Sequence, residues 1–198
     1  MRQSKAADVL SGAKTIFLKF GLVGASVDAI AEEAKVSKAT IYAHSPNKNM
    51  LFLRVVQSEC DSLSSKISRS LLSTDGEPRA VLEELSRRVI RLLLDDDHIR
   101  LVRACISAVS ILPEAGELYL EAGPVQATRA VAKILQGLCE EGTLKVHDTQ
   151  VAAGHFIHLS VSGIILPRLL TVNQQIDASE QSKRAVDAFI EIYAANNT

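Results

Sequence analysis

The chain of 198 residues contains no tryptophan, five prolines and ten glycines, and it is rich in alanine, leucine, isoleucine, serine and glutamate, a composition that favours an all-helical protein. The three cysteines, at positions 60, 105 and 139, are odd in number and widely spaced, which excludes a disulfide framework and a CxxC metal site. Long apolar runs are also absent. The most apolar segment, 156–170, is interrupted by His158 and Arg168 and is too short to cross a bilayer.

The N-terminal segment MRQSKAADVL lacks the apolar core of a signal peptide, so we expect a cytoplasmic protein without a membrane partner. No GxSxG, HExxH or glycine-rich phosphate loop occurs, which indicates that the protein is not an enzyme and needs no cofactor. His155 and His158 are three residues apart and could share a metal ion. Because no third ligand lies nearby, core or interface histidines are the preferred interpretation.

The chain does contain enough apolar residues for a sizeable core: it is 47% hydrophobic and 23% charged, and one or two compact domains are expected. The formal net charge of −1 hides an asymmetry, because residues 1–50 are basic overall and the remainder is acidic overall. A mildly basic head on an acidic body suits a DNA contact confined to one end.

The sequence SVDAIAEEAKVSKATIYAHSPNK, which begins at Ser26, has the pattern of two short helices joined by a tight turn. Ser26 and Ser37 are the expected N-caps of these helices, and Asn47 is the expected N-cap of a third helix beginning at Lys48. If the first helix ends near Ala34, the apolar side chains all face inward: Val27, Ile30, Ala31, Ala34, Val36 and Ile41. This spacing predicts a helix-turn-helix. The alternative is an ordinary helical hairpin with a solvated outer face.

The polar side chains of the second short helix are expected on its outer surface, where a recognition helix meets the major groove. The hydroxyl groups of Thr40 and Tyr42 can reach phosphate oxygens, and Lys38 can contact phosphate or guanine. Tyr42 could instead be a core aromatic residue, and His44 could either touch phosphate or fill the junction with the next helix. Lys48, at a helix N-terminus, makes a natural phosphate clamp.

Further helices are expected on both sides of this segment. A helix from about Ser4 to Phe20 carries an apolar core stripe and ends at Gly21. The segment 98–112 is apolar on most sides and is expected near the centre of the body. The complete set of later helices runs from 48 to the turn at 73–78, then over 79–94, 98–112, 113–123, a helix ending at 142, 148–170 and 179–194.

The stretch IFLKFGLVGASVDAIAEEAKVSKATIYAHSPNKNMLF, from Ile16 to Phe52, resembles the N-terminal domain of the TetR/AcrR family of transcriptional regulators. The residues that carry the resemblance are Phe17, Gly21, Ala31, the run from Val36 to Tyr42, Lys48, Leu51 and Phe52. Members of that family are all-helical homodimers with a three-helix DNA-binding head and a larger ligand-binding body. The predicted DNA-binding set is Ser26, Ser37, Lys38, Thr40, Tyr42, His44 and Lys48.

Three positions depart from the family pattern. Lys35 occupies a turn position that is usually glycine and often has a positive φ, at a cost of about 1 kcal/mol. Ser45 stands where an aromatic residue is usual, which predicts looser packing after the recognition helix, and Asn49 replaces a glutamate. The segment 118–159, with its EAGP turn, GxL segment and Asp-capped helix, is similar to the C-terminal domain of an AefR-like subgroup.

The resemblance implies an all-α fold in which residues 1–48 form the DNA-binding domain and residues 49–198 form the ligand-binding and dimerisation domain. The last two helices are candidates for self-association into a four-helix bundle, although they could instead close the monomer's own core. Their apolar residues are Val161, Ile165, Leu169, Val186, Phe189, Ile190 and Tyr193. In a homodimer, two heads about 34–36 Å apart would address successive major grooves of a palindromic operator.

An unidentified small-molecule effector of apolar or amphipathic character is expected to bind in the body and to release a repressor from its operator, weakening binding about 5–150-fold. Repression is inferred from the usual behaviour of the family. The candidate pocket residues are Cys60, Cys105, Val109 and Phe156, for which plain core packing is the alternative. Two other functions are weighed: a redox-responsive regulator using Cys105, disfavoured because apolar surroundings raise the pKa of a thiol, and a helical protein-interaction module.

Overall fold

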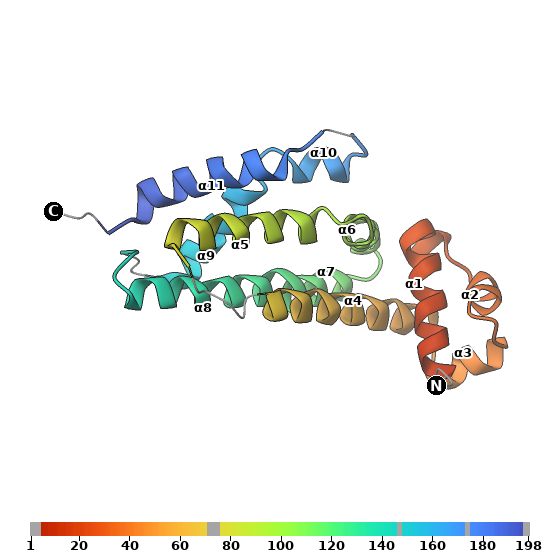
Figure 1. Cartoon of the computed structure of the whole chain (residues 1–198). Coiled ribbons are helices and arrows are strands. Elements are labelled where there is room, and N and C mark those ends of the chain that lie inside the picture. Colours follow the sequence, from red (N-terminus) through yellow and green to blue (C-terminus); the bar gives the residue numbers. More distant parts are fainter. Residues whose placement is uncertain (1–4, 71–75, 146–147, 173–174, 196–198) are drawn as a thin grey trace. The chain divides into compact units, whose positions relative to one another are not determined.

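The computed structural model describes residues 5–70, 76–145, 148–172 and 175–195, which are helical apart from turns, short loops and one isolated β-bridge between Leu144 and Ala194. The predicted all-α class is therefore confirmed. In chain order the elements are α1 (Lys5–Gly24), α2 (Val27–Glu33), α3 (Lys38–His44), α4 (Lys48–Ser70), α5 (Pro78–Leu93), α6 (Asp96–Ala108), α7 (Glu114–Leu120), the π-helical turn η1 (Glu121–Val125), α8 (Gln126–Glu140), α9 (Thr149–Ser160), α10 (Ile165–Leu169) and α11 (Ala178–Tyr193) (Figure 1).

The contacts within the chain define two compact units. Unit 1 comprises Met1–Ser62 and Asp96–Ala122, and unit 2 comprises Leu63–Asp95 and Gly123–Thr198. Helices α1, α2 and α3 therefore share a unit with the first part of α4 and with α6 and α7. The domain boundary after residue 48 stays a prediction.

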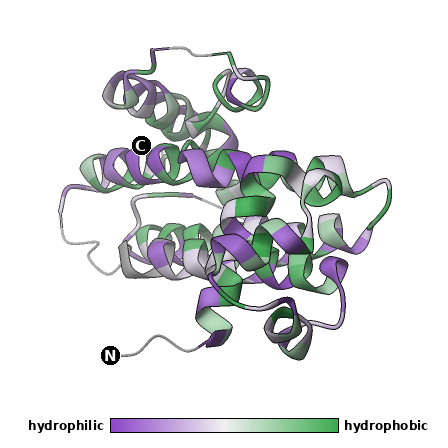
Figure 2. Ribbon diagram, turned by 90° about the vertical axis from the view of Figure 1, so that its right-hand side faces the viewer, coloured by the Kyte–Doolittle hydropathy of each residue, from purple (hydrophilic) through white to green (hydrophobic). Residues whose placement is uncertain are grey.

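The core of unit 1 is built around α1, which packs against α2, α3 and α6. At its centre, the rings of Phe17 on α1 and Phe52 on α4 meet edge to face with centroids 5.1 Å apart, and both side chains are fully buried. Apolar and polar residues alternate around the helices, as they do in helices that bury one face (Figure 2). Burial of these apolar faces holds α2 and α3 against α1.

Lys14 on α1 ties three helices of unit 1 together. Its Nζ lies 2.8 Å from Oε2 of Glu59 on α4 and 3.0 Å from Oδ2 of Asp97 on α6. Partial burial acts to lower the pKa of Lys14, but hydrogen bonds and the charges of the two carboxylates outweigh it and raise the pKa. The ammonium group is therefore charged at neutral pH.

The core of unit 2 forms where α11 packs against α5 and α9 and where α8 packs against α9. Phe156 on α9 and Phe189 on α11 make a second edge-to-face pair, with centroids 5.1 Å apart and both rings fully buried. The hydroxyl of Ser86 donates to Oγ of Ser160 at 2.9 Å, and Ser160 donates to the carbonyl oxygen of Phe156 at 2.8 Å. The buried hydroxyl groups thus have hydrogen-bond partners, as buried polar groups require.

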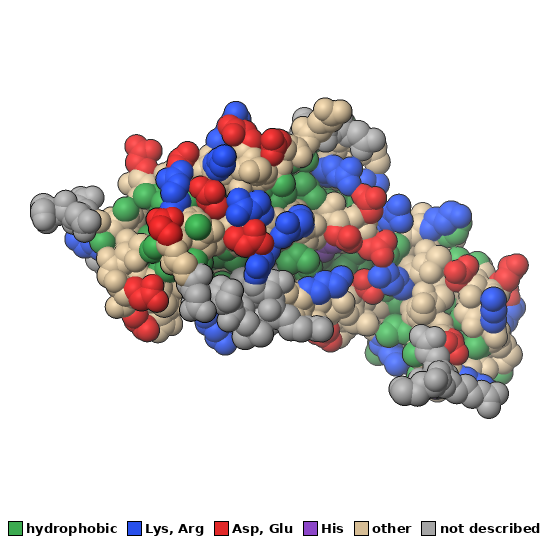
Figure 3. Space-filling view, viewed as in Figure 1, with side chains coloured by type: hydrophobic (Ala, Val, Ile, Leu, Met, Phe, Trp, Pro, Cys, Tyr) green, Lys and Arg blue, Asp and Glu red, His purple; other side chains and the backbone are tan. Residues whose placement is uncertain are grey.

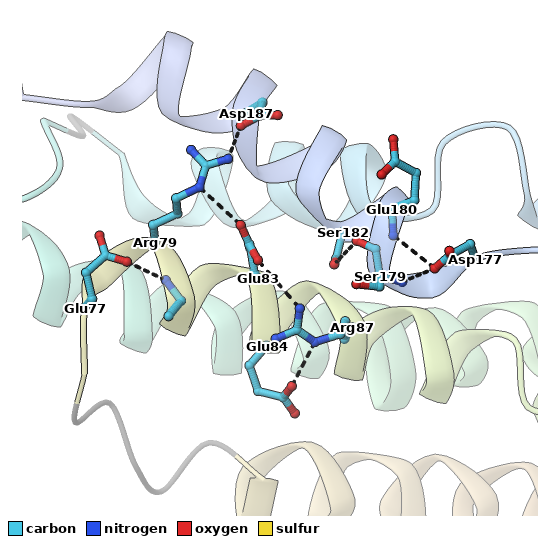
Figure 4. A network of polar contacts seen from close by, with 11 residues as sticks. Glu77, Arg79, Glu83, Glu84, Arg87, Asp177, Ser179, Glu180, Ser182 and Asp187 are labelled. Atoms are coloured by element: carbon cyan, nitrogen blue, oxygen red, sulfur yellow. Dashed lines mark hydrogen bonds and ion pairs between the residues drawn. The ribbon is translucent and has the colours of Figure 1, made fainter.

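Charged side chains of both signs lie side by side on the surface that carries α5 and α11 (Figure 3). Arg79 on α5 pairs with Asp187 on α11, and Glu84 accepts a hydrogen bond from Arg87 at 3.0 Å (Figure 4) and another from Arg88 at 2.7 Å. Burial acts to raise the pKa of Glu84, but the two arginines outweigh it and lower the pKa. Since exposed ion pairs contribute about 1 kcal/mol or less each, this network keeps the surface polar without dominating stability.

The segment predicted as a central helix over 98–112 is shorter and more exposed than expected. Helix α6 ends at Ala108, and Ile106 and Val109 are 59% and 40% exposed. The segment was expected near the centre of the body because it is apolar on most sides, but only some of its apolar side chains are covered: Ile99, Leu101, Ala104, Cys105 and Ala108 are buried, whereas Ile106 and Val109 are exposed. The apolar composition of the segment did not indicate which of its side chains other helices would cover.

Two further helix boundaries differ from prediction for backbone reasons. Gly123 and Pro124 do not end a helix, because they lie in the π-helical turn that joins α7 to α8, where a residue without an N–H is tolerated. The helix predicted over 148–170 is broken after Ser160. Gly163 adopts φ 74°, in the left-handed region that interrupts a helix, and α10 begins again at Ile165.

Within the described ranges, no helix is both long enough and apolar enough to cross a bilayer, and no group of three or more His, Cys, Asp or Glu side chains is placed to hold a metal ion. Nδ1 of His155 lies 2.6 Å from the hydroxyl of Tyr193. Nδ1 of His158 donates to the carbonyl oxygen of Gly154 at 2.7 Å. Both histidines therefore have partners inside unit 2.

Candidate nucleic-acid interface

Helices α2 and α3 are joined by a tight turn and lie together beside α1 (Figure 1). Oγ of Ser26 accepts a hydrogen bond from the backbone N–H of Ala29 at 3.0 Å, and Oγ of Ser37 accepts one from that of Thr40 at 3.1 Å. Both predicted N-caps are confirmed. In the turn, Lys35 has φ 54°, the left-handed conformation expected for a position that is usually glycine.

Helix α3 buries one face and exposes the opposite one. Ile41 is 2% exposed and belongs to the core of unit 1, whereas Tyr42 is 52% exposed. Lys38 lies on the exposed face, while Thr40 and His44 are half-buried. Because successive helical residues are about 100° apart, positions 38 and 42 share a face from which positions 40 and 44 turn away. The expected outward placement therefore holds for Lys38 and Tyr42 and only partly for Thr40 and His44.

Two exposed residues of α3, Ala39 and Ala43, were missed by the sequence reasoning. These two alanines, together with Lys38 and Tyr42, make up the outward face of α3. The available signal was the helical period itself. At 100° per residue, positions 39 and 43 each lie about 160° around the helix axis from the buried Ile41, on the opposite side of the helix.

Several contacts fix the position of α3. Lys38 makes an ion pair with Asp28 in the first turn of α2. The guanidinium group of Arg54 on α4 donates to the carbonyl oxygen of His44, at the end of α3. Ser45 is 1% exposed and donates to the carbonyl oxygen of Asn47 at 3.3 Å. The junction for which the sequence predicted looser packing is therefore closed to solvent by a small buried residue.

Lys48 is the first residue of α4, whose predicted cap is confirmed by a 2.8 Å hydrogen bond from the N–H of Met50 to Oδ1 of Asn47. Nζ of Lys48 donates to the carbonyl oxygen of Ala25 at 2.8 Å, directly before Ser26. One of its three N–H groups is thus engaged within the protein, and its charge lies beside the N-terminus of α2.

The four predicted pocket residues are divided between the two units. Cys60 and Cys105 are buried in the core of unit 1, Phe156 is buried in the core of unit 2, and Val109 is exposed. Burial raises the pKa of Cys60 to about 11 and that of Cys105 to about 12. Both thiols are therefore protonated, and weakly nucleophilic, at neutral pH.

The residues predicted for the dimer interface separate into two groups. Val186 and Phe189 are 0% exposed in the core of unit 2, so their assignment to an exposed interface is corrected: they are core residues. The other five, Val161, Ile165, Leu169, Ile190 and Tyr193, are half-buried. Helix α10 buries none of its residues although its sequence, ILPRL, is largely apolar. This helix leaves apolar surface uncovered.

Two capped helices joined by a tight turn, with one outward face on the second helix, form a helix-turn-helix motif. Comparison with known proteins gives the family. Residues 9–55 match the family described as "Bacterial regulatory proteins, tetR family", and residues 80–195 match the "AefR-like transcriptional repressor, C-terminal domain". The chain therefore belongs to the TetR family, whose members are DNA-binding transcriptional regulators, not enzymes, and act as dimers with small-molecule effectors.

Individual proteins of this family resemble the chain to different extents. The HTH-type transcriptional activator FasR of Mycolicibacterium smegmatis is 30% identical over 107 residues, which make up 50% of this chain and 49% of FasR. A TetR-family transcriptional regulator from Mesorhizobium loti has a solved structure with a TM-score of 0.91 and 26% identity, covering 96% of both chains. The structure of the Flavonoid-responsive Regulator FrrA has a TM-score of 0.80 and 25% identity, covering 97% of this chain and 98% of that chain. The match with FasR thus spans about half of that protein, whereas the structural likeness covers nearly the whole chain.

Proposed function

We propose that this protein is a ligand-responsive transcriptional regulator that binds a palindromic DNA operator as a homodimer. The observation that carries the proposal is the outward face of α3, presented by a helix whose position is fixed by caps, an ion pair and a buried Ile41. One seven-residue helix makes few contacts with DNA. Two copies related by a twofold axis, about 34–36 Å apart, would read two half-sites in successive turns of the duplex.

In this proposal the side chains around α3 contact DNA in two ways, some at the bases and others at the sugar–phosphate backbone. Lys38 and Tyr42 enter the major groove from the outward face, where base edges can be read. The hydroxyl, imidazole and ammonium groups at the rim contact the sugar–phosphate backbone, which positions the head without specifying sequence. This rim consists of Ser26, Ser37, Thr40, His44 and Lys48.

The second copy is proposed to cover the apolar surface of α10 and the edges of α9 and α11. Leu166 and Leu170 are each 64% exposed, an unusual exposure for two leucines so near each other. The half-buried residues named above, from Val161 to Tyr193, complete this proposed surface. Two α-helical faces of this kind can pack as a bundle across a twofold axis.

We further propose that the protein represses transcription and is released by an apolar or amphipathic small molecule. The repressor description of the matched C-terminal family supports repression, whereas FasR is described as an activator. FrrA is described as flavonoid-responsive, which supports an effector of this type. The redox alternative is disfavoured, because the raised pKa of Cys105 leaves little thiolate to react. A promoter–reporter fusion whose output rises when the regulator gene is deleted supports repression, and a fall supports activation.

The experiment that tests the proposed function is DNA binding by a Tyr42→Ala variant. Fluorescence anisotropy with duplexes from the region flanking its own gene is expected to show salt-sensitive, sequence-selective binding by the wild type, weakened roughly tenfold in the variant. Gel filtration is expected to show an unchanged dimer. Leu120→Ala, which truncates an exposed side chain on α7, is the control and should bind like the wild type. Equal affinity of wild type and Tyr42→Ala, or loss of the dimer, contradicts the proposal.

A second variant, Asp28→Asn, is expected to bind DNA more tightly than the wild type. Asp28 engages Lys38 in an exposed ion pair and places a negative charge beside the proposed phosphate contacts. Since such pairs contribute about 0.2–1 kcal/mol, releasing Lys38 should raise affinity about 1.4- to fivefold at low salt and less at high salt. Glu33→Gln, an exposed acidic residue at the other end of α2, is the matched control. Weaker binding by Asp28→Asn would instead mean that Asp28 holds Lys38 in its DNA-binding position.

A further inference from the structure

The outward face of α3 has an unusual chemical character for a surface that reads DNA. Two of its four side chains, Ala39 and Ala43, consist of a single methyl group, and both are exposed. They are four residues apart on a helix, so their Cβ atoms lie about 5–6 Å from each other along one edge of the face. Neither side chain can donate or accept a hydrogen bond.

The neighbouring polar groups on α3 do not supply that edge with hydrogen-bonding capacity. The hydroxyl of Thr40 lies 2.9 Å from Oγ of Ser37, and Thr40 is half-buried. His44 is also half-buried. Lys38 is drawn toward Asp28 on α2. The edge that contains Ala39 and Ala43 therefore offers apolar contact and close approach of the helix backbone, and little else.

The major groove presents one apolar group that such an edge can recognise, the 5-methyl group of thymine. Resting on the proposed DNA-binding function, we propose that Ala39 and Ala43 read thymine 5-methyl groups in each operator half-site. Tyr42, between them in sequence, supplies the longer reach and the hydroxyl. The two alanines would thus specify sequence through methyl contacts rather than through hydrogen bonds to base edges.

The competing explanation is that these alanines are only good helix formers in a seven-residue helix. The two explanations differ in what they predict for the DNA. If the alanines act only as helix formers, replacing thymine with deoxyuridine should leave the affinity unchanged. If they read methyl groups, replacing specific thymines should weaken binding, because deoxyuridine pairs identically and lacks only the methyl group.

The test begins with full-length wild-type protein and a random duplex library, from which repeated selection yields the preferred sequence. Each thymine of that sequence is then replaced by deoxyuridine, one position at a time, and the dissociation constant is measured by fluorescence anisotropy at fixed salt. Two positions per half-site are expected to lose affinity about fourfold each, corresponding to about 0.8 kcal/mol for one buried methyl group.

Glycine variants assign each methyl contact to one alanine. In Ala39→Gly and in Ala43→Gly, one of the two sensitive thymines is expected to become insensitive to deoxyuridine while the other keeps its effect. Any loss of helix stability weakens binding to both duplexes equally, so it cancels in the double-mutant cycle. Ala80→Gly, at an exposed alanine in the first turn of α5, is the matched control and should keep both sensitivities.

The outcomes separate this inference from the proposed function. A library selection that returns no preferred sequence overturns both. A preferred sequence in which every thymine tolerates deoxyuridine overturns only the reading of methyl groups by α3. Full deoxyuridine sensitivity in both glycine variants also overturns it, because the methyl groups would then be read by other residues.

Discussion

Replacing Phe189 with alanine is expected to lower the free energy of unfolding by about 3–5 kcal/mol. The ring is fully buried in unit 2, with its centroid 5.1 Å from that of Phe156 and 4.7 Å from that of Tyr193. Its removal leaves a cavity among side chains that cannot all move inward. Since folded domains are stable by only about 5–15 kcal/mol, the loss is a large part of the total. Urea denaturation followed by circular dichroism measures it.

The control for this prediction is Ile192→Ala on the same helix. Ile192 is 61% exposed, so its truncation should change the free energy of unfolding by no more than about 0.5 kcal/mol. Comparing the stability and sedimentation of Phe189→Ala and Ile192→Ala also distinguishes a core role for Phe189 from an interface role. A Phe189→Ala protein that unfolds like the wild type but sediments as a monomer would place this ring between two chains, against the burial described above.

Replacing Gly12 with alanine is expected to destabilise unit 1 by about 1–3 kcal/mol and to weaken operator binding with it. Gly12 lies on α1 where Ala34, the residue after α2, approaches closely. A Cβ atom at position 12 would lie 2.7 Å from the backbone nitrogen of Ala34 and 2.8 Å from its Cα. Backbone atoms cannot yield as a flexible side chain can, so the end of α2 and the turn at Lys35 must shift. Thermal unfolding and anisotropy measure the two effects.

Gly137→Ala is the matched control, and its expected effect has the opposite sign. Gly137 lies within α8, and a Cβ atom there would meet nothing within 4 Å. Because alanine favours the helix by about 1 kcal/mol over glycine, this variant should be slightly more stable than the wild type. If Gly12→Ala were also more stable, the close approach of α1 and Ala34 would be contradicted.

The features predicted correctly from the sequence depend on residues close together in the chain. The caps at Ser26, Ser37 and Asn47 each involve one side chain and the backbone N–H three residues later, so their signal lies within a single turn. The positive φ of Lys35 was expected from the family resemblance, because that turn position is usually glycine. Local chemistry therefore sufficed to predict the helix-turn-helix.

The features that were missed depend on direction or on distant contacts. Ala39 and Ala43 were overlooked because their side chains carry no polar group, although the helical period places them outward. Ile106 is exposed although the segment 98–112 was expected near the centre of the body, because sequence shows that a side chain is apolar but not which neighbour covers it. The same limit applies to Phe189, whose stripe on α11 suits an interface and a core equally well. Only the packing of α11 against α5 and α9 separates them.

The two short side chains on α3 also bear on how such regulators diverge. Positions 39 and 43 are exposed, so longer residues there could extend into solvent while Ile41 keeps its place in the core. A descendant of this protein could therefore acquire a new target site through one or two surface substitutions. Because such substitutions would leave the buried core unchanged, they would not need stabilising substitutions elsewhere in the protein.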